Sequence, residues 1–273
     1  MKTTQLLTVA ACLLIPLAVR ANDIAPGQEF QLATQAANPI ILDGNLSEWN
    51  GRQVVNPQFY FPKGSGAGGQ LLSFEEYPGA QDGTTWSGPS DQSSVFQILF
   101  DQLNVYLGVI VTDDYHEHAA GAAWDGDAVQ IMIANPARDA QVALYNFALS
   151  GVEGALGSTI IDHEAGPGGT DAVVSRNSTT HQTTYEIKLP KESLLIDNLT
   201  PGVQFGFGMA INDGDEATPG QRGWGGLGPH ALVFGKTPSE TAVVTLVPEP
   251  GSLGLSMMAI IGATLLRCRK RQR

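Results

Sequence analysis

The sequence predicts an all-β domain, an antiparallel β-sandwich of the jelly-roll type, between two terminal targeting segments. Short runs of β-branched and aromatic residues alternate with turns rich in Gly, Pro and Asp. No stretch of the chain keeps a 3.6-residue apolar period, and the 273 residues include 32 glycines and 16 prolines. With 42% hydrophobic and 15% charged residues, the composition excludes a disordered polyelectrolyte, a coiled coil and a collagen-like repeat.

The N-terminal residues 1–21 are expected to form a secretory signal peptide. Lys2 supplies a positive charge, residues 6–19 form a short apolar core, and a small-residue cleavage site follows. A lipoprotein processing box ending at Cys12 is an alternative. The polar, weakly patterned residues 22–38 are predicted to be a linker or an edge segment.

The β-sandwich is predicted to span residues 39–247 as a series of short strands. Two of these runs flank Asp101-Gln102 and form a hairpin by their spacing. The expected strands are, in chain order, residues 40–42, 95–100, 103–112, 128–134, 142–149, 172–175, 183–189, 203–211, 231–234 and 242–247.

Three segments between these strands are expected to lack β-structure. Residues 190–195 are predicted to form a helical turn, because Pro190 is tolerated in the first turn of a helix. Residues 64–94 and 151–169 are long, glycine-rich insertions. Loops of that length inside a compact domain are usually functional or disordered.

The predicted exported part of the chain is more acidic than the whole. The full sequence has a formal charge of −12, but residues 22–250 keep eight basic residues and all 27 acidic ones, which gives −19. This charge argues against non-specific nucleic-acid binding, which needs a basic surface. Both cysteines, Cys12 and Cys268, lie in the terminal segments. The domain therefore has no disulfide and depends on its core, with or without bound cations.

Acidic turns are candidate cation sites. Asp125 and Asp127 lie in an Asp-Gly-Asp turn directly before a predicted strand, and Ca²⁺ prefers the carboxylate oxygens of such loops. Asp and Gly also form ordinary turns without a metal, and residues 212–216 form a second acidic turn with the same two interpretations. His116 and His118 lie among carboxylates and either bind a transition metal such as zinc or belong to a solvated loop.

All four tryptophans lie in or beside turns rich in glycine and aspartate. An exposed indole stacks on the apolar face of a sugar ring, while neighbouring polar side chains bind the sugar's hydroxyl groups. We expect this role for Trp124 and Trp224. Trp49, beside the first predicted strand, is expected to cover the end of the core instead.

The chain has no established catalytic motif. It has no Gly-x-Ser-x-Gly elbow, phosphate-binding loop, zinc-protease motif or dinucleotide fingerprint, and the predicted mature domain has no cysteine nucleophile. Among 27 acidic residues, pairs of carboxylates arise by chance. A glycan hydrolase with paired carboxylates is therefore an alternative without specific support, and we expect a protein that is not an enzyme.

Five short motifs follow one another along the predicted domain. Residues 41–49 have the sequence Ile-Leu-Asp-Gly-Asn-Leu-Ser-Glu-Trp, and residues 124–130 have the sequence Trp-Asp-Gly-Asp-Ala-Val-Gln. The other three motifs are residues 105–114, 184–190 and 207–213. Together they resemble the family 9 carbohydrate-binding modules and their DOMON-like relatives.

This resemblance implies a β-sandwich that often binds calcium and holds the ends of sugar chains between two tryptophans. By position, Trp124 would be one stacking residue, and Gln130 and Asn212 would bind sugar hydroxyl groups. The family's second tryptophan is expected where this chain has Asp215, so Trp224 would have to replace it. A well-placed arginine for the sugar hydroxyl groups is also missing.

The C-terminal residues 248–273 complete a three-part pattern. Val247-Pro248-Glu249-Pro250 is followed by an uncharged, mostly apolar stretch of residues 251–266 and by an arginine-rich tail. The apolar stretch is at the short end for crossing a membrane, and an ordinary tail anchor is an alternative. The order of the parts resembles the PEP-CTERM sorting signal of Gram-negative bacteria, which implies processing by a membrane protease of the exosortase type.

The sequence thus predicts an exported, non-catalytic carbohydrate-binding protein at the cell surface or in the extracellular matrix, anchored in the membrane transiently or permanently. The expected partners are a polysaccharide or oligosaccharide, the exosortase-type protease and, before processing, the membrane, but no nucleic acid. Structural Ca²⁺ is the expected cofactor, without an organic cofactor. A structural matrix protein without sugar binding, and the glycan hydrolase, are the alternatives.

Overall fold

A computed structural model of the chain describes residues 30–49, 59–61, 73–76, 86–119, 121–216, 218–233 and 235–248. The predicted signal peptide and nearly all of the predicted sorting signal lie outside the described residues. Within the described part of the chain, no helix has the length and apolar character needed to cross a membrane.

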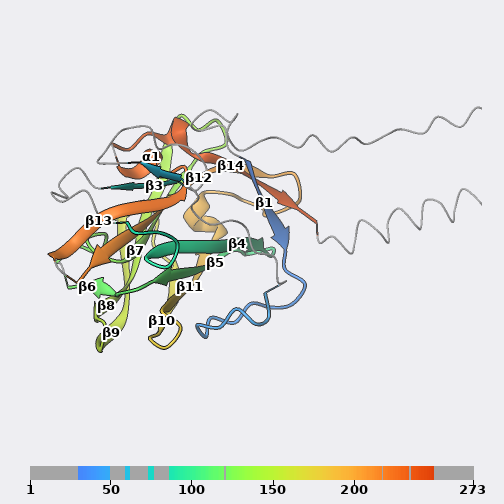
Figure 1. The fold of residues 1–273 in the computed structure, drawn as a ribbon. Coiled ribbons are helices and arrows are strands. Elements are labelled where there is room, and N and C mark those ends of the chain that lie inside the picture. Colours follow the sequence, from blue (N-terminus) through green and yellow to red (C-terminus); the bar gives the residue numbers. More distant parts are fainter. Residues whose placement is uncertain are drawn as a thin grey trace, which may run out of the picture.

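Strands make up most of the described structure (Figure 1). They are β1 (Phe30–Gln35), β2 (Phe59–Phe61), β3 (Ser73–Glu76), β4 (Gln92–Phe100), β5 (Asn104–Asp113), β6 (Glu117–His118), β7 (Ala128–Ala134), β8 (Gln141–Val152), β9 (Ala155–Ala165), β10 (Asp171–Asn177), β11 (Gln182–Pro190), β12 (Gln204–Asp215), β13 (Thr218–Leu227) and β14 (Ala242–Val247). The helical segments are single turns, namely η2 (Lys191–Leu194), α1 (His230–Val233) and η3 (Pro238–Glu240). The all-β prediction is confirmed, and η2 confirms the helical turn predicted after Pro190.

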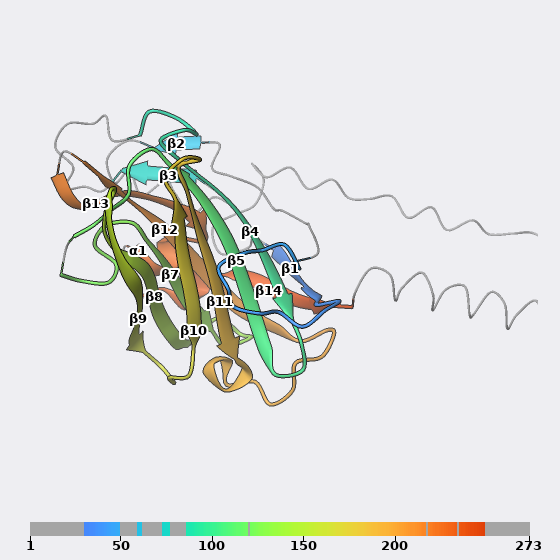
Figure 2. The same ribbon diagram turned by 90° about the horizontal axis from the view of Figure 1, so that it is seen from below.

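The strands pair into one sheet that curls over, so that two halves face each other (Figures 1 and 2). The first half has the order β10-β11-β5-β4, and the second half contains β14, β12, β7, β8 and β9. β1 joins the halves, because it pairs in parallel with β4 on one side and with β14 on the other. The sheet is therefore mixed, which corrects the prediction of purely antiparallel pairing.

Apolar side chains from both halves meet in one core. Successive residues of a strand point to opposite faces, so Phe96 of β4 and Leu107 of β5 meet Ile131, Phe147 and Phe207 of β7, β8 and β12 between the halves. All five are buried. Burying one such side chain contributes about 1.5–3 kcal/mol, so this core can support a domain that has no disulfide. The two-layer arrangement predicted for a sandwich is thus present.

Six described strands formed where the sequence predicted none, namely β1, β2, β3, β6, β9 and β13, and β3 lies within the expected insertion of residues 64–94. β1 lies within the expected linker or edge segment, yet it fills the gap between two strand edges with backbone hydrogen bonds, and its Ala33 is buried. β9 lies within the expected loop of residues 151–169 and forms a hairpin with β8. No β9 side chain is buried, so the strand lacks the apolar alternation that would have predicted it.

Two predicted strands are absent. Residues 40–42 are not in a strand, and Ile41 is exposed. Residues 231–233 belong to the helical turn α1, whose buried Ala231 and Leu232 pack against β7 and β8 rather than within the sheet. Short apolar runs do not by themselves distinguish a strand from a helical turn.

Candidate functional site

A row of polar side chains crosses the outer face of the second half of the sheet. Gln130 of β7, Asn146 of β8 and Asn212 of β12 alternate along their strands with core residues, so they point away from the core. The strand register places Gln130 directly opposite Asn146. The predicted ligand residues Gln130 and Asn212 are thereby brought together.

Hydrogen bonds link this amide row into one chain. Gln221 Nε2 of β13 donates to Asn212 Oδ1 at 2.7 Å, and Asn212 Nδ2 donates to Gln130 Oε1 at 3.3 Å. Gln130 Nε2 donates to Asn146 Oδ1 at 2.9 Å, and Asn146 Nδ2 donates to Asp162 Oδ2 of β9 at 2.9 Å. Every amide donates toward the carboxylate, so the orientation of each one is fixed by its neighbours.

Trp124 lies at the edge of the amide row. Its backbone carbonyl accepts a hydrogen bond from Asn212 Nδ2 at 2.7 Å, which ties the loop before β7 to β12. The Trp124 side chain is 38% exposed, and with Asp162 and Glu164 it lines a cavity of about 430 Å³. This volume suits a small-molecule site. An exposed indole and oriented polar groups therefore share one cavity.

A buried imidazole lines the same cavity. His118 of β6 is only 3% exposed, and neither of its ring nitrogens has a hydrogen-bond partner among the described residues. Burial lowers the pKa of His118, so the ring is neutral at pH 7 and offers one donor and one acceptor. Both ring nitrogens are themselves buried, so a ligand hydroxyl would have to reach them from the cavity.

Trp224, the second predicted stacking residue, lies on β13 directly opposite Asn212. Paired residues of antiparallel strands share a face, so Trp224 belongs to the same side of the sheet as the amide row. Its side chain is 2% exposed, however, whereas Trp124 is 38% exposed. Of these two tryptophans, Trp124 alone presents a ring surface, and stacking by Trp224 stays a prediction.

Asp125 and Asp127, the predicted metal ligands, hold loops together through their carboxylates. Asp127 Oδ1 accepts the backbone N–H of Gly214 at 2.7 Å, and its Oδ2 accepts that of Glu117 at 2.8 Å. Asp125 Oδ1 accepts the backbone N–H of Gln221 at 2.8 Å. Each carboxylate is thus satisfied by backbone N–H groups and does not require a metal. A metal bound by Asp125 and Asp127 stays a prediction.

A group of buried acids occupies the same end of the core. Asp113 and Asp127 have carboxylate oxygens within 4.8 Å of each other and of a ring nitrogen of His116. Burial raises the pKa of Asp113 well above its usual range and that of Asp127 to about 7. Burial lowers the pKa of His116. Burial thus favours the neutral form of each of these three groups.

A second acidic group fits a hard cation better. Oxygens of Asp91, Asp213 and Asp215 lie within 4.8 Å of one another. Asp213 is buried, and its Oδ2 has no hydrogen-bond partner among the described residues. Burial, followed by the neighbouring carboxylates, raises the pKa of Asp213 well above its usual range. An all-oxygen group with an unpartnered buried oxygen matches the ligand preference of Ca²⁺.

Comparison with known proteins identifies a family for this chain. Residues 74–228 match the sequence model of the carbohydrate family 9 binding domain-like family. The chain belongs to this family. The resemblance of its motifs to family 9 is thereby confirmed, and the family 9 domain includes Trp124 and the whole amide row. A comparison with curated protein sequences finds no match.

Two solved structures share the fold of this family 9 domain. Both are of a family 9 carbohydrate-binding module from Caldicellulosiruptor kristjanssonii, one in complex with cellotriose and the other with glucose. Each is 12% identical to this chain, with TM-scores of 0.54 and 0.53. The alignments cover 81% and 80% of this chain and 95% and 97% of the two modules.

One residue of the amide row and two of the cavity were not predicted as ligand residues. Asn146 lies between two core residues of a predicted strand, so its outward direction was available from strand alternation. Asp162 and Glu164 lie on β9, which the sequence placed in a loop, and no local pattern identifies them. Only the pairing of β9 with β8 brings them to the amide row.

Proposed function

We propose that this domain binds neutral glycans, without catalysis, in the cavity beside Trp124. The observation that supports this function is the exposed Trp124 indole at the edge of the hydrogen-bonded amide row. The indole would stack on the apolar face of a sugar ring, and Asp162, Glu164 and His118 would bind its hydroxyl groups. The binding of cellotriose and of glucose by modules of the same fold supports the choice of ligand class.

The arrangement of the cavity carboxylates favours binding over hydrolysis. Asp162 and Glu164 lie two residues apart on β9, so they approach a ligand from one side. Asn146 Nδ2 donates to both, at 2.9 and 3.4 Å, and Lys236 Nζ lies 3.6 Å from Glu164. Glycosidases instead place two carboxylates on either side of the bond that is cleaved. The strong negative charge of residues 22–250 further favours neutral glycans over anionic ones.

Trp124→Ala tests the proposed binding function. Titration calorimetry of the purified chain with cellotriose and with glucose should show binding by the wild type. The variant should lose at least about tenfold in affinity, equivalent to ~1.4 kcal/mol of stacking and burial. Leu103→Ala is a matched control, because Leu103 is an exposed apolar side chain in the turn between β4 and β5. Unchanged affinity in Trp124→Ala would show that the cavity is not the glycan site.

We also propose that Ca²⁺ stabilises the domain at Asp91, Asp213 and Asp215. The support is the unpartnered Oδ2 of Asp213 within a group of three carboxylates. A bound cation would neutralise their repulsion and join β12 to the segment before β4. It would have no direct role in holding the glycan.

We propose further that the protein is exported and sorted to the cell surface by an exosortase-type system, with residues 1–21 as the signal peptide. The support is the order of Val247-Pro248-Glu249-Pro250, the apolar stretch and the arginine-rich tail. Fractionation of cells that produce the Pro248→Ala/Glu249→Ala/Pro250→Ala variant should show the protein retained in the membrane. Surface delivery equal to that of the wild type would contradict this sorting route.

A further inference from the structure

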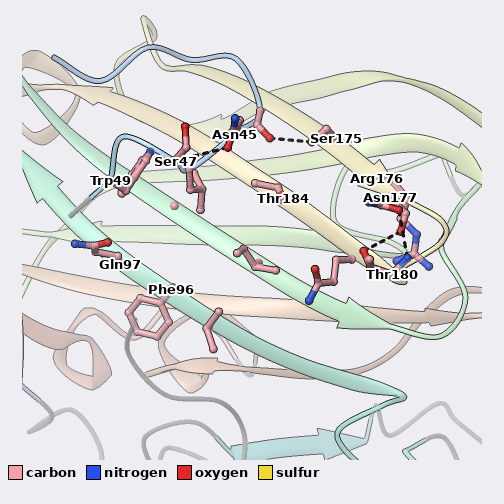
Figure 3. Close-up of a pocket in the computed structure, with 16 residues that line it drawn as sticks. Asn45, Ser47, Trp49, Phe96, Gln97, Ser175, Arg176, Asn177, Thr180 and Thr184 are labelled. Atoms are coloured by element: carbon pink, nitrogen blue, oxygen red, sulfur yellow. Dashed lines mark hydrogen bonds between the residues drawn. The ribbon is translucent and has the colours of Figure 1, made fainter. Parts of the chain in front are cut away.

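A second cavity, of about 530 Å³, lies on the outer face of the other half of the sheet (Figure 3). Its floor is formed by outward-facing residues of β4, β5, β11 and β10, and one wall is the segment of residues 44–49. In Figure 3, Asn45, Ser47 and Trp49 line this wall above the strands. The protein core separates this cavity from the Trp124 cavity.

Glu186 of β11 holds the wall in place. Its Oε2 accepts the backbone N–H groups of Asp43 and Gly44 at 2.8 and 2.9 Å, and its Oε1 accepts the indole N–H of Trp49 at 3.0 Å. Gly44 has a φ of 81°, which favours glycine, and its carbonyl accepts a hydrogen bond from Ser175 Oγ of β10. The wall is thus bound at both of its ends, so the cavity is preformed.

Gly108 of β5 allows the wall to pack closely against the sheet, because it has no side chain. A Cβ atom at this position would lie 3.0 Å from Leu46 Cδ1 and 3.1 Å from Trp49 Cζ3. Any larger residue would displace the side chains of Leu46 and Trp49. Trp49 also packs against Leu99 and Tyr106 on this outer face, so the wall has an apolar base.

The lining of the cavity is polar and neutral. Arg176 is its sole charged residue among the 16 that line it, and its guanidinium is occupied by Glu153, by Thr183 and by the carbonyl of Asp113. The side chains that face the cavity include amides and hydroxyls from three elements, among them Asn45, Ser47, Gln97, Gln182 and Thr184.

One of these amides lacks a partner. Gln97 of β4 is 8% exposed, and its Nε2 has no hydrogen-bond partner among the described residues. A buried, unpartnered amide donor costs free energy unless a ligand or water binds it. Apolar side chains of Val95 and Ile110 lie on the same floor. Amide, hydroxyl and apolar groups without free charge are complementary to a polyhydroxylated, uncharged ligand.

We propose that this cavity is a second binding site, for a sugar unit of a neutral glycan. The site has its own wall, floor and polar groups and shares no residue with the Trp124 cavity. If the proposed function holds as well, the domain has glycan sites on two opposite outer faces. One molecule then bridges two glycan chains, and binding to a polymer is strengthened by the high effective concentration of the second site.

Filling the cavity tests the proposal. Thr184 lies on the floor and is half-buried, so Thr184→Trp occupies the cavity without changing the core. Thr245→Trp on the outward face of β14 is the matched control. Titration calorimetry of the purified chain uses glucose, cellotriose, xylotriose and maltotriose as probes, in the wild type, in Trp124→Ala, in Thr184→Trp and in the double variant.

We expect Trp124→Ala to retain one glycan site per chain, Thr184→Trp to retain the other, and the double variant to bind none of the four probes. Gln97→Leu, which removes the unpartnered amide without filling the cavity, should weaken the second site about tenfold. Thermal unfolding of each variant shows whether the fold is intact.

The outcomes separate the two proposals. Loss of all binding in Trp124→Ala, with full binding in Thr184→Trp, overturns the second site and leaves the proposed function standing. Loss of all binding in Thr184→Trp, with full binding in Trp124→Ala, overturns the proposed function at the Trp124 cavity and leaves the second site standing. If the folded wild type binds none of the four probes, both are overturned.

Discussion

His118 shows at the residue scale how an unpartnered group can indicate a ligand. His118 lines the Trp124 cavity, and neither of its buried ring nitrogens has a hydrogen-bond partner among the described residues. His118→Leu should therefore lower glycan affinity at the Trp124 cavity about tenfold, because a hydrogen bond to the sugar is lost. The thermal unfolding temperature should stay the same or rise, because no protein hydrogen bond is broken.

His118→Gln is the control for this variant, since glutamine keeps one donor and one acceptor. It should recover part of the affinity measured by titration calorimetry. Equal affinity in His118→Leu and the wild type would show that the imidazole takes no part in binding.

Glu186 explains two sequence motifs through one set of contacts. The Asp-Gly and the tryptophan of residues 41–49 are the groups that donate to its two oxygens. Glu186→Gln places an amide N–H₂ against donor groups, so it should lower the free energy of unfolding by about 1–3 kcal/mol. Urea unfolding measures the change, and Glu192→Gln at an exposed position of η2 is the control. An equal effect of both changes would contradict the assigned role.

At the scale of elements, Gly108 sets the distance between β5 and the segment of residues 44–49. Gly108→Val would place side-chain atoms where Leu46 and Trp49 pack, so unfolding should become easier by about 1–3 kcal/mol. Binding at the second cavity should be lost, because its wall moves. Gly168→Val is the control, since a Cβ there makes only ordinary contacts, at 3.6 and 3.7 Å from the His163 ring. Full stability and binding in Gly108→Val would show that the wall adapts.

The elements also show what the sequence could predict. β5 and β12 were predicted because they are short runs rich in apolar and β-branched residues. Strand alternation then places Gln130 of β7 and Asn212 of β12 on the outer face. β9 could not be predicted, because an exposed hairpin strand needs no apolar pattern. Asp162 reaches the amide row only because β9 pairs with β8, and Asn212 reaches Gln130 only because β12 pairs with β7. No local stretch of sequence specifies these pairings.

At the scale of the whole molecule, the negative charge is partly internal. Asp91, Asp113, Asp127, Asp213 and Asp215 interact at one end of the core. Burial raises the pKa of Asp213 most, and its four acidic neighbours raise it further. A carboxyl group with a raised pKa binds more protons in the folded state than in the unfolded state. Its contribution to stability is therefore complete below the unfolded pKa of about 4 and is lost as the pH rises toward the folded pKa.

Asp213→Asn tests both this repulsion and the proposed calcium site. In a chelator, the variant should be more stable than the wild type, and the difference should grow as the pH rises from about 4, because asparagine does not ionise. With Ca²⁺ at pH 7.5 the wild type should gain stability and the variant should not, as followed by thermal unfolding. Asp197→Asn, at an exposed position, is the control. A variant less stable than the wild type in chelator would contradict the repulsion, whereas equal responses to Ca²⁺ would contradict the metal site.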